Sequence, residues 1–287
     1  MMNNFSNIRI GIFALILLIS SPIIGQEKLS AILAPRELHD LISKENIVIV
    51  DLRGESDYKD EHIPGSINSN RKLFENTELP YSGMMASKDK VEKILSGLGI
   101  LPASQIIIYD ESTSLDAARL WFVLKTYGHQ KVQLLDGGIQ LWKRQNFVVT
   151  KDTGRVNPSS YKFPKQKGLE YYATREEVKS VLKNQNVVIL DVRSEREFSA
   201  GHIPGAIHLE WTNNLEKENV FKSSEALKEQ FEKLGITPDK QIITYCRSGV
   251  RAAHTGFILK DLLGYENVKI FDGSWIEWSH FGEEVEK

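Results

Sequence analysis

The chain has a single cysteine, Cys246, among its 287 residues. One cysteine excludes an internal disulfide, and it also excludes zinc and iron–sulfur sites that need several thiolates. The seven histidines are far apart, with no close pair at the spacing of metal ligands, so no metal site is expected. One thiol therefore remains, and its role has to be inferred from its neighbours in the sequence.

A strong charge of either sign is also missing, since the formal net charge is −2. This near balance gives no reason to expect a nucleic acid or an anionic membrane surface as a partner. Hydrophobic residues make up 41% of the chain and charged residues 26%, which is the composition of an ordinary globular protein. The length suggests about two domains.

The one long apolar run, residues 10–24, follows a polar segment whose only charged side chain is Arg9. The run is shorter than the roughly 20 residues that a membrane-spanning helix needs. This pattern is typical of a secretory signal peptide. We predict that residues 1–25 are removed after Gly25 and that the mature chain is exported to the periplasm without stable membrane association. A retained membrane anchor is the alternative.

The rest of the chain contains one unit twice. The matching segments are residues 47–53 and 187–193, 61–67 and 201–207, 105–109 and 241–245, and 135–137 and 271–273. From Leu98, which matches Leu234, the copies align without a gap. We therefore predict one domain at 26–148, a polar linker rich in Pro and Gly at 149–170, and a second domain at 171–287.

Each copy alternates apolar strands with helices. The expected helices are 38–43, 56–60 and 88–97 in the first copy and 174–183, 195–200, 224–234 and 252–263 in the second, and the expected strands include 105–109, 132–135, 241–245 and 268–271. This alternation predicts the α/β class, with two tandem domains that are each a parallel sheet with helices on both faces. Ligands of such sheets bind beyond the carboxyl ends of the strands.

Cys246 falls at such an end, because a strand stops at Tyr245 and a helix is expected from residue 252. Backbone N–H groups and the helix dipole favour an anion at this place. Arg247 and Arg251 flank the thiol and favour the thiolate, which is the reactive form of cysteine. We interpret Cys246 as a nucleophile. The alternative is a small buried apolar side chain.

The first copy lacks this arrangement. At the equivalent positions Asp110 replaces Cys246, Glu111 replaces Arg247 and Leu115 replaces Arg251. Two carboxylates should repel an anion, so we predict that only the second domain is catalytic and that the first provides packing and one wall of the cleft. Arg119 is expected either to pair with Asp110 or Glu111 or to be solvated.

Several motifs together resemble the tandem-domain rhodanese sulfurtransferases over residues 30–285. They are the doubled His-Ile-Pro-Gly turn, the loop Cys-Arg-Ser-Gly-Val-Arg at 246–251, the segment Asp-Gly-Ser-Trp at 272–275 and Ala-Arg-Leu-Trp at 118–121. The resemblance implies that Cys246 takes the outer sulfur of thiosulfate as a persulfide and passes it to cyanide or a thiol. It implies no cofactor beyond this covalent intermediate, and small-molecule donors and acceptors as partners. Separately, we expect a monomer.

The same resemblance implies that the loop residues Arg247, Ser248, Gly249, Val250 and Arg251 bind the donor and the persulfide. Arg247 would contact the sulfonate oxygens with its planar fork. Asp191 and Arg193 are candidates for supporting this loop. Because Asp51 and Arg53 match them in the copy without the cysteine, a purely structural pair is the alternative.

The choice of donor follows from the residue after the cysteine. Arginine there is typical of the family's thiosulfate enzymes, and glycine is typical of those that use 3-mercaptopyruvate, which is the alternative donor. Ser248 and Glu197 depart from the thiosulfate pattern, because cationic residues stand there in the animal enzymes.

Two other classes of function are alternatives. Phosphatases and arsenate reductases on the related fold have five residues between cysteine and arginine, whereas this chain has four. A non-catalytic binding module fits poorly with a cysteine flanked by two arginines.

Overall fold

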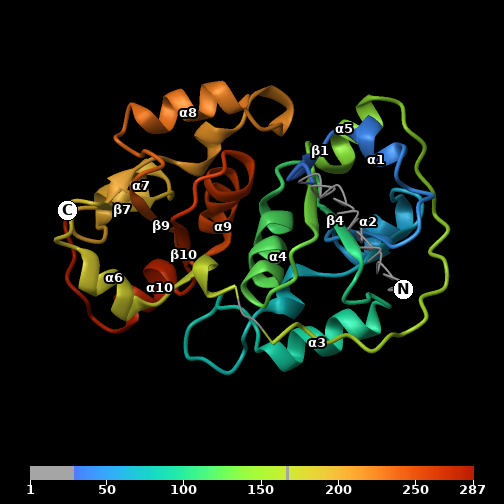
Figure 1. Cartoon of the computed structure of the whole chain (residues 1–287), viewed down its shortest axis with the longest axis horizontal. Coiled ribbons are helices and arrows are strands. Elements are labelled where there is room, and N and C mark those ends of the chain that lie inside the picture. The colour runs from blue at the N-terminus through green and yellow to red at the C-terminus, as the bar shows by residue number, and fades with distance from the viewer. Residues whose placement is uncertain (1–28, 166–167) are drawn as a thin grey trace, which may run out of the picture.

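The computed structural model describes residues 29–165 and 168–287. The signal peptide expected at residues 1–25 lies outside this described part. Among the described residues, no helix is both long enough and apolar enough to cross a membrane. The chain forms two α/β units side by side, and the segment between them runs along the outer edge of the first unit (Figure 1).

The first unit is a five-stranded parallel sheet with strand order β1-β5-β4-β2-β3. Its strands are β1 (Ile32–Leu33), β2 (Ile47–Asp51), β3 (Ser66–Asn68), β4 (Gln105–Tyr109) and β5 (Val132–Leu135). Its helices are α1 (Pro35–His39), α2 (Glu55–Asp60), the 3-10 helix η1 (Arg71–Phe74), α3 (Lys88–Gly97), α4 (Leu115–Thr126) and α5 (Gly138–Arg144). The central strand β4 is buried from Ile106 onward, as its run of apolar residues requires.

The second unit repeats this topology with strand order β6-β10-β9-β7-β8. Its strands are β6 (Tyr172–Ala173), β7 (Val187–Asp191), β8 (Ile207–His208), β9 (Gln241–Tyr245) and β10 (Val268–Phe271). Its helices are α6 (Arg175–Val181), α7 (Glu195–Ala200), α8 (Ser224–Glu232), α9 (Val250–Phe257) and α10 (Ser274–His280), with short turns η2 (Leu169–Tyr171), η3 (Trp211–Asn214), η4 (Lys217–Asn219) and the π-helix η5 (Ile258–Leu262). The predicted pair of tandem parallel-sheet domains is confirmed.

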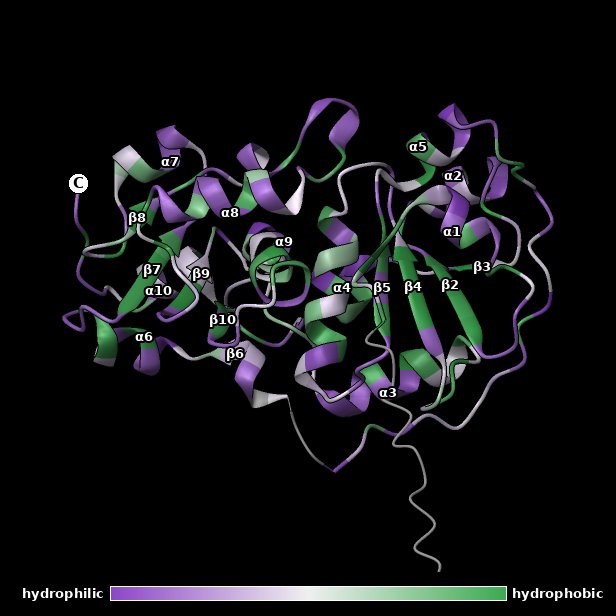
Figure 2. Cartoon of the chain, turned by 45° about the horizontal axis from the view of Figure 1, so that its top comes forward, coloured by the Kyte–Doolittle hydropathy of each residue, from purple (hydrophilic) through white to green (hydrophobic). Residues whose placement is uncertain are grey.

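Helices cover both faces of each sheet. On the outer faces, α1 and α5 pack through Leu38 and Ile139, and α6 and α10 pack through Val178 and Trp278. The inner faces, which α3, α4, α8 and α9 cover, share one continuous apolar core. Figure 2 shows the matching hydropathy of the elements. The central strands are mostly hydrophobic, whereas the outer helices alternate between polar and apolar residues.

Some element boundaries differ from those predicted. The helix expected at 38–43 is α1, which starts earlier because Pro35 is suited to the first helical position. The helix expected at 252–263 is divided between α9 and the wider turn of η5. The edge strands β1 and β6 were not predicted, since two residues are too few to show an alternating pattern.

The units meet across α4 and α9 in a reciprocal way. The N–H of Met85 donates to the Asp272 carboxylate at 2.9 Å, and the N–H of Phe221 donates to Asp136 at 3.1 Å. These are the same contact in the two units. Asp272 follows Asp136 by 136 residues in the aligned repeat, and Met85 and Phe221 form matching antiparallel bridges with Glu75 and Leu215. Each unit thus covers part of the other, as the subunits of a symmetric dimer do.

The connecting segment packs on the first unit. Thr150 forms a short antiparallel bridge with His62, and the hydroxyl of Tyr161 lies 2.8 Å from Nδ1 of His129. Tyr161 and Phe163 are buried in the shared core. The linker expected at 149–170 therefore contributes to packing as well as to connection.

Candidate active site

Cys246 lies directly after β9, at the carboxyl end of the second sheet. It opens a loop of residues 246–251, here called the Cys246 loop, which ends in the first turn of α9. Gly249 adopts a φ of 80°, a conformation that favours glycine. A Cβ atom at this position would lie 2.7 Å from the carbonyl oxygen of Asp272. The tight turn that follows the thiol therefore requires a glycine.

The residues of the Cys246 loop differ in how far their side chains are exposed to solvent. Cys246 is only 1% exposed, whereas the side chain of Arg247 is open to solvent. In the described part of the chain, the guanidinium of Arg247 has no hydrogen-bond or ion-pair partner. Ser248 and Val250 are half-buried. The thiol is therefore sheltered, whereas the next residue, Arg247, exposes its guanidinium to solvent.

The turn between β10 and α10 fixes the backbone of the loop. The N–H of Cys246 donates to Oγ of Ser274 at 3.1 Å, and the N–H of Trp275 donates to the Cys246 carbonyl at 2.9 Å. The N–H of Ile276 donates to the Arg247 carbonyl at 3.0 Å. Ser274 was not among the predicted site residues. Its signal in the sequence was its place directly after the repeated Asp-Gly pair.

Arg251 ends the loop and is oriented by a carboxylate. Its two terminal nitrogens donate to Glu197 at 2.6 and 2.8 Å. These bonds from Arg251, helped by bonds from Ser194, lower the pKa of Glu197 to about 2. The pKa of Arg251 is raised by Glu197 and also by Cys246. From the sequence, Glu197 could be described only as a carboxylate at a position where the animal thiosulfate enzymes have a cationic residue. In the structure it is the hydrogen-bond partner of Arg251.

The first unit shows what occupies the same loop without a cysteine. The Asp110 carboxylate accepts hydrogen bonds from the N–H groups of Ser114, Asp116 and Ala117, at 3.0, 3.0 and 3.4 Å. Burial is the main reason that the pKa of Asp110 is raised to about 6. Asp110 thus does more than repel an incoming anion, because its own carboxylate fills the ring of donors at the start of α4.

The expectation for Arg119 is wrong in both of its forms. Arg119 is 1% exposed, so it is not solvated, and it pairs with neither Asp110 nor Glu111. Its Nη2 lies 2.5 Å from Oδ1 of Asp272 and donates to the Gly83 carbonyl at 2.6 Å. The physical reason is that α4 lies at the seam between the units, so this side chain meets the second unit.

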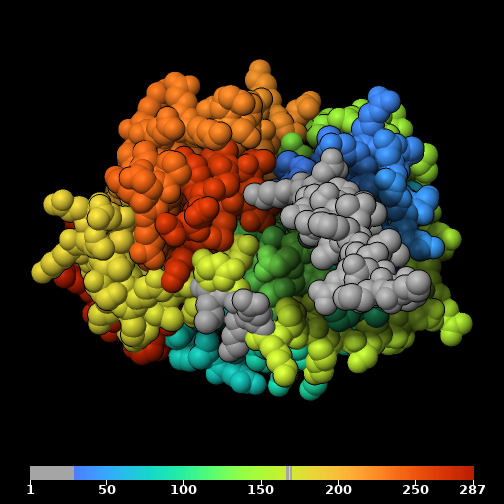
Figure 3. Space-filling view, viewed as in Figure 1, coloured from blue at the N-terminus to red at the C-terminus, as the bar shows by residue number. Residues whose placement is uncertain are grey.

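Residues 75–86 of the first unit form a wall against the Cys246 loop. A Cβ atom at Gly83 would lie 2.5 Å from Cβ of Ser248, so the two backbones approach closely. The hydroxyl of Tyr81 donates to Glu277 of α10 at 3.3 Å. In Figure 3 this cyan part of the chain lies against the red C-terminal residues at the lower edge of the molecule. The first unit therefore takes part in shaping the site.

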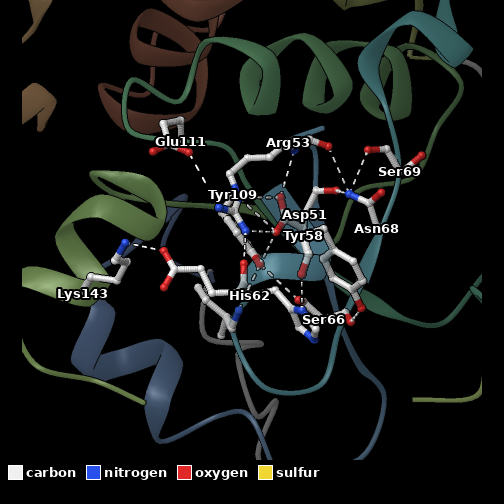
Figure 4. A network of polar contacts seen from close by, with 12 residues as sticks. Asp51, Arg53, Tyr58, His62, Ser66, Asn68, Ser69, Tyr109, Glu111 and Lys143 are labelled. Carbon is white, nitrogen blue, oxygen red and sulfur yellow. Dashed lines mark hydrogen bonds and ion pairs between the residues drawn. The ribbon is translucent and has the colours of Figure 1, made fainter. Parts of the chain in front are cut away.

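Asp191 and Arg193 form a buried pair that has a twin in the first unit. Nε and Nη2 of Arg193 donate to the Asp191 carboxylate at 3.0 and 2.5 Å. Figure 4 shows the matching pair of Asp51 and Arg53. The presence of the pair beside a loop without cysteine favours a structural role. The link to the site is indirect, because the Arg193 guanidinium lies 4.4 Å from the ring centre of Trp275.

Two parallel-sheet units, of which one carries a sheltered thiol at its carboxyl edge, define a tandem α/β protein with a single cysteine. The chain belongs to the rhodanese family, since the Rhodanese-like domain matches it twice, at residues 34–145 and 174–281. This finding confirms the resemblance seen in the sequence.

Individual relatives agree with this assignment. The chain is 35% identical over 239 residues to a putative thiosulfate sulfurtransferase of Saccharopolyspora erythraea, covering 77% of this chain and 83% of that protein. It is 30% identical over 260 residues to a thiosulfate sulfurtransferase of Pseudomonas aeruginosa, covering 88% and 95%. Among solved structures it is similar to SseA of Escherichia coli, a 3-mercaptopyruvate sulfotransferase, with a TM-score of 0.77, 28% identity, and coverage of 86% and 99%.

Proposed function

We propose that the chain is a thiosulfate sulfurtransferase, which takes the outer sulfur atom of thiosulfate onto Cys246 and delivers it to cyanide or a small thiol. The observation that carries this proposal is the pair of loops at the starts of α4 and α9. The family and the named relatives support it, since two of them are described as thiosulfate sulfurtransferases or putative ones.

The Asp110 loop indicates what the Cys246 loop can bind. The N–H groups that donate to Asp110 belong to Ser114, Asp116 and Ala117. Their equivalents 136 residues later are those of Val250, Ala252 and Ala253. Cysteine has no carboxylate of its own to satisfy these donors. The N–H of Ala253 donates to the Gly249 carbonyl at 3.0 Å, whereas those of Val250 and Ala252 have no acceptor among the described residues and are available to an anion attached to the sulfur. A persulfide, whose terminal sulfur is anionic, meets this requirement.

In the first step, the thiolate of Cys246 attacks the outer sulfur of thiosulfate. A new S–S bond forms, the original S–S bond breaks, and sulfite leaves with its electron pair. The free guanidinium of Arg247 is placed to bind the sulfonate oxygens and then to stabilise the departing dianion. The product is a Cys246 persulfide beside the N–H groups of α9 and the guanidinium of Arg251.

In the second step, a nucleophilic acceptor attacks the terminal sulfur of the persulfide. With cyanide, a C–S bond forms, the S–S bond breaks, and the electron pair returns to Cys246 as its thiolate. Thiocyanate is the product, and neither oxidant nor reductant is consumed overall. Such a double displacement predicts ping-pong kinetics.

The test of this proposal is the intact mass of the chain after incubation with thiosulfate. We expect the wild type to gain one sulfur atom, to lose it when cyanide is added, and to release sulfite in equal amount. Cys246→Ala and Cys246→Ser should gain none. A wild-type chain that stays unmodified with both thiosulfate and 3-mercaptopyruvate would contradict the proposal.

A second donor, 3-mercaptopyruvate, is favoured by the likeness to SseA and by Ser248 at the third loop position. Steady-state rates with the two donors distinguish the possibilities. We expect wild type to prefer thiosulfate, and Arg247→Gly to shift the 3-mercaptopyruvate-to-thiosulfate ratio of kcat/KM upward by about tenfold or more, because one charge-assisted contact to sulfonate is lost. An unchanged ratio would refute the role given to Arg247.

We also propose that residues 26–148 and 171–287 are the two domains and that the chain is exported after cleavage behind Gly25. The apolar run at 10–24 and the internal repeat support this. N-terminal sequencing of the chain recovered from the periplasm tests it, and a mature chain that still begins at Met1 would contradict it.

A further inference from the structure

We propose that Arg119 of the first unit is a positioning residue for the Cys246 loop. The proposal rests on the sulfurtransferase function given above. Arg119 acts through Asp272 and Gly249 and does not touch the donor. Through this role, the domain without a nucleophile would contribute to catalysis by fixing the geometry of the Cys246 loop.

The first observation is the way in which the guanidinium divides its contacts. Nη2 lies 2.5 Å from Asp272 and donates to Gly83 at 2.6 Å, so it ties α4 to two segments at once. Nη1 is buried and has no hydrogen-bond partner among the described residues. This second nitrogen lies 2.8 Å from the point where a Cβ on Gly249 would stand. One terminal nitrogen of the guanidinium thus pairs with Asp272, and the other packs against the Cys246 loop at Gly249.

The second observation is the path from Asp272 to the thiol. Asp272 is fully buried and starts the turn that contains Ser274. Oγ of Ser274 accepts the N–H of Cys246 at 3.1 Å. The other carboxylate oxygen of Asp272 accepts the N–H of Met85 at 2.9 Å. A cation that fixes Asp272 therefore also fixes the turn that holds the nucleophile.

The third observation is that the arginine is present on only one half of the reciprocal interface. The counterpart of Arg119 is Thr255 (119 + 136), whose hydroxyl instead accepts a hydrogen bond from Asn214 at 3.1 Å. Asp136, the counterpart of Asp272, has no cation partner among the described residues, and burial raises its pKa to about 6. The equivalent half of the interface thus packs without an arginine, and Arg119 is found only on the half that contacts the Cys246 loop.

Arg119→Lys separates positioning from stability. A lysine can still pair with Asp272, so the buried carboxylate keeps a cation and the fold is retained, but lysine has no second nitrogen to place against Gly249. We expect kcat for sulfur transfer from thiosulfate to fall about tenfold or more, since small displacements of a catalytic group are costly. KM should stay within about twofold because Arg247 is untouched, and the Tm should stay close to that of wild type.

The matched control is Asp136→Asn, which alters the equivalent contact on the half without cysteine. It is expected to change the Tm while kcat stays at the wild-type value. If Arg119→Lys fails to fold, the neutral pair Arg119→Gln with Asp272→Asn is measured in the same way, with the same loss in kcat expected.

Two results would overturn the proposal: a wild-type kcat in the folded Arg119 variants, or an equal loss of kcat in Asp136→Asn. Loading of wild-type Cys246 is measured first by intact mass. Absent loading refutes the sulfurtransferase function, whereas normal loading with unaffected Arg119 variants refutes the positioning role alone.

Discussion

At the scale of single residues, the replacement of cysteine by aspartate in the first unit gives a measurable dependence on pH. The pKa of Asp110 is about 6 in the fold against an ordinary value of 3.8, because burial disfavours the charge. The folded state therefore binds more protons than the unfolded state between these values, and Asp110 makes stability fall as the pH rises through this window.

Asp110→Asn removes this titration. We predict that the Tm of the variant minus that of wild type becomes more positive between pH 4 and pH 7.5, as measured by thermal melts in matched buffers. Asp136 titrates in the same range but is present in both proteins, so its contribution cancels in the difference. A difference in Tm that does not change with pH would contradict the assignment.

The residues of the site differ in how far the sequence could reveal them. Cys246, Arg247 and Arg251 were accessible because a strand end, a loop and a helix start are local features with known electrostatics. The contact between Arg119 and Asp272 was not, because it depends on how two units dock and joins residues 153 positions apart (272 − 119). Local patterns carry no information about such a partner.

At the scale of elements, the junction between β9 and α9 depends on one glycine. In Gly249→Ala the backbone keeps a φ of 80°, and the new methyl group would meet the Asp272 carbonyl at 2.7 Å and Arg119 at 2.8 Å. We predict the loss of most sulfurtransfer activity and about 2–4 kcal/mol of stability, since strain and overpacking add. Chemical denaturation and the intact-mass assay measure the two effects.

Gly205→Ala is the matched control, because Gly205 has a similar φ of 72° but open space around its Cβ position. It should cost only the conformational strain, about 1 kcal/mol, and leave activity intact. If both variants lose the same amount of stability and activity, the contact with Arg119 and Asp272 has no effect beyond backbone strain.

The elements themselves were largely predictable from the sequence. Helices α3, α6 and α8 begin after Ser87, Thr174 and Ser223, whose side chains accept N–H bonds from the first turn, and such caps leave a clear signature. The strands β5 and β10 have the predicted bounds because each is a short, mainly apolar segment between polar residues. The π-helix η5 and the edge strands β1 and β6 were missed because tertiary packing rather than local sequence sets them.

At the scale of the whole molecule, the continuous inner core predicts that both units unfold together. Trp121 of α4 meets Phe257 of α9 edge to face at 5.3 Å, and both side chains are fully buried. We predict one calorimetric transition whose enthalpy equals the van't Hoff value. In Phe257→Ala the free energy of unfolding should fall by about 3–5 kcal/mol, and unfolding should still take place in a single transition. Two resolved transitions, in wild type or variant, would contradict a shared core.

The reciprocal interface also has a consequence for behaviour at low concentration. Two separate copies that covered each other in this way would dissociate on dilution, and each would then expose its inner face. Here residues 149–170 join the halves, so their encounter is intramolecular and takes place at an effective concentration that dilution cannot change. The contact between residues 75–86 and the Cys246 loop therefore forms to the same extent at low and at high protein concentration.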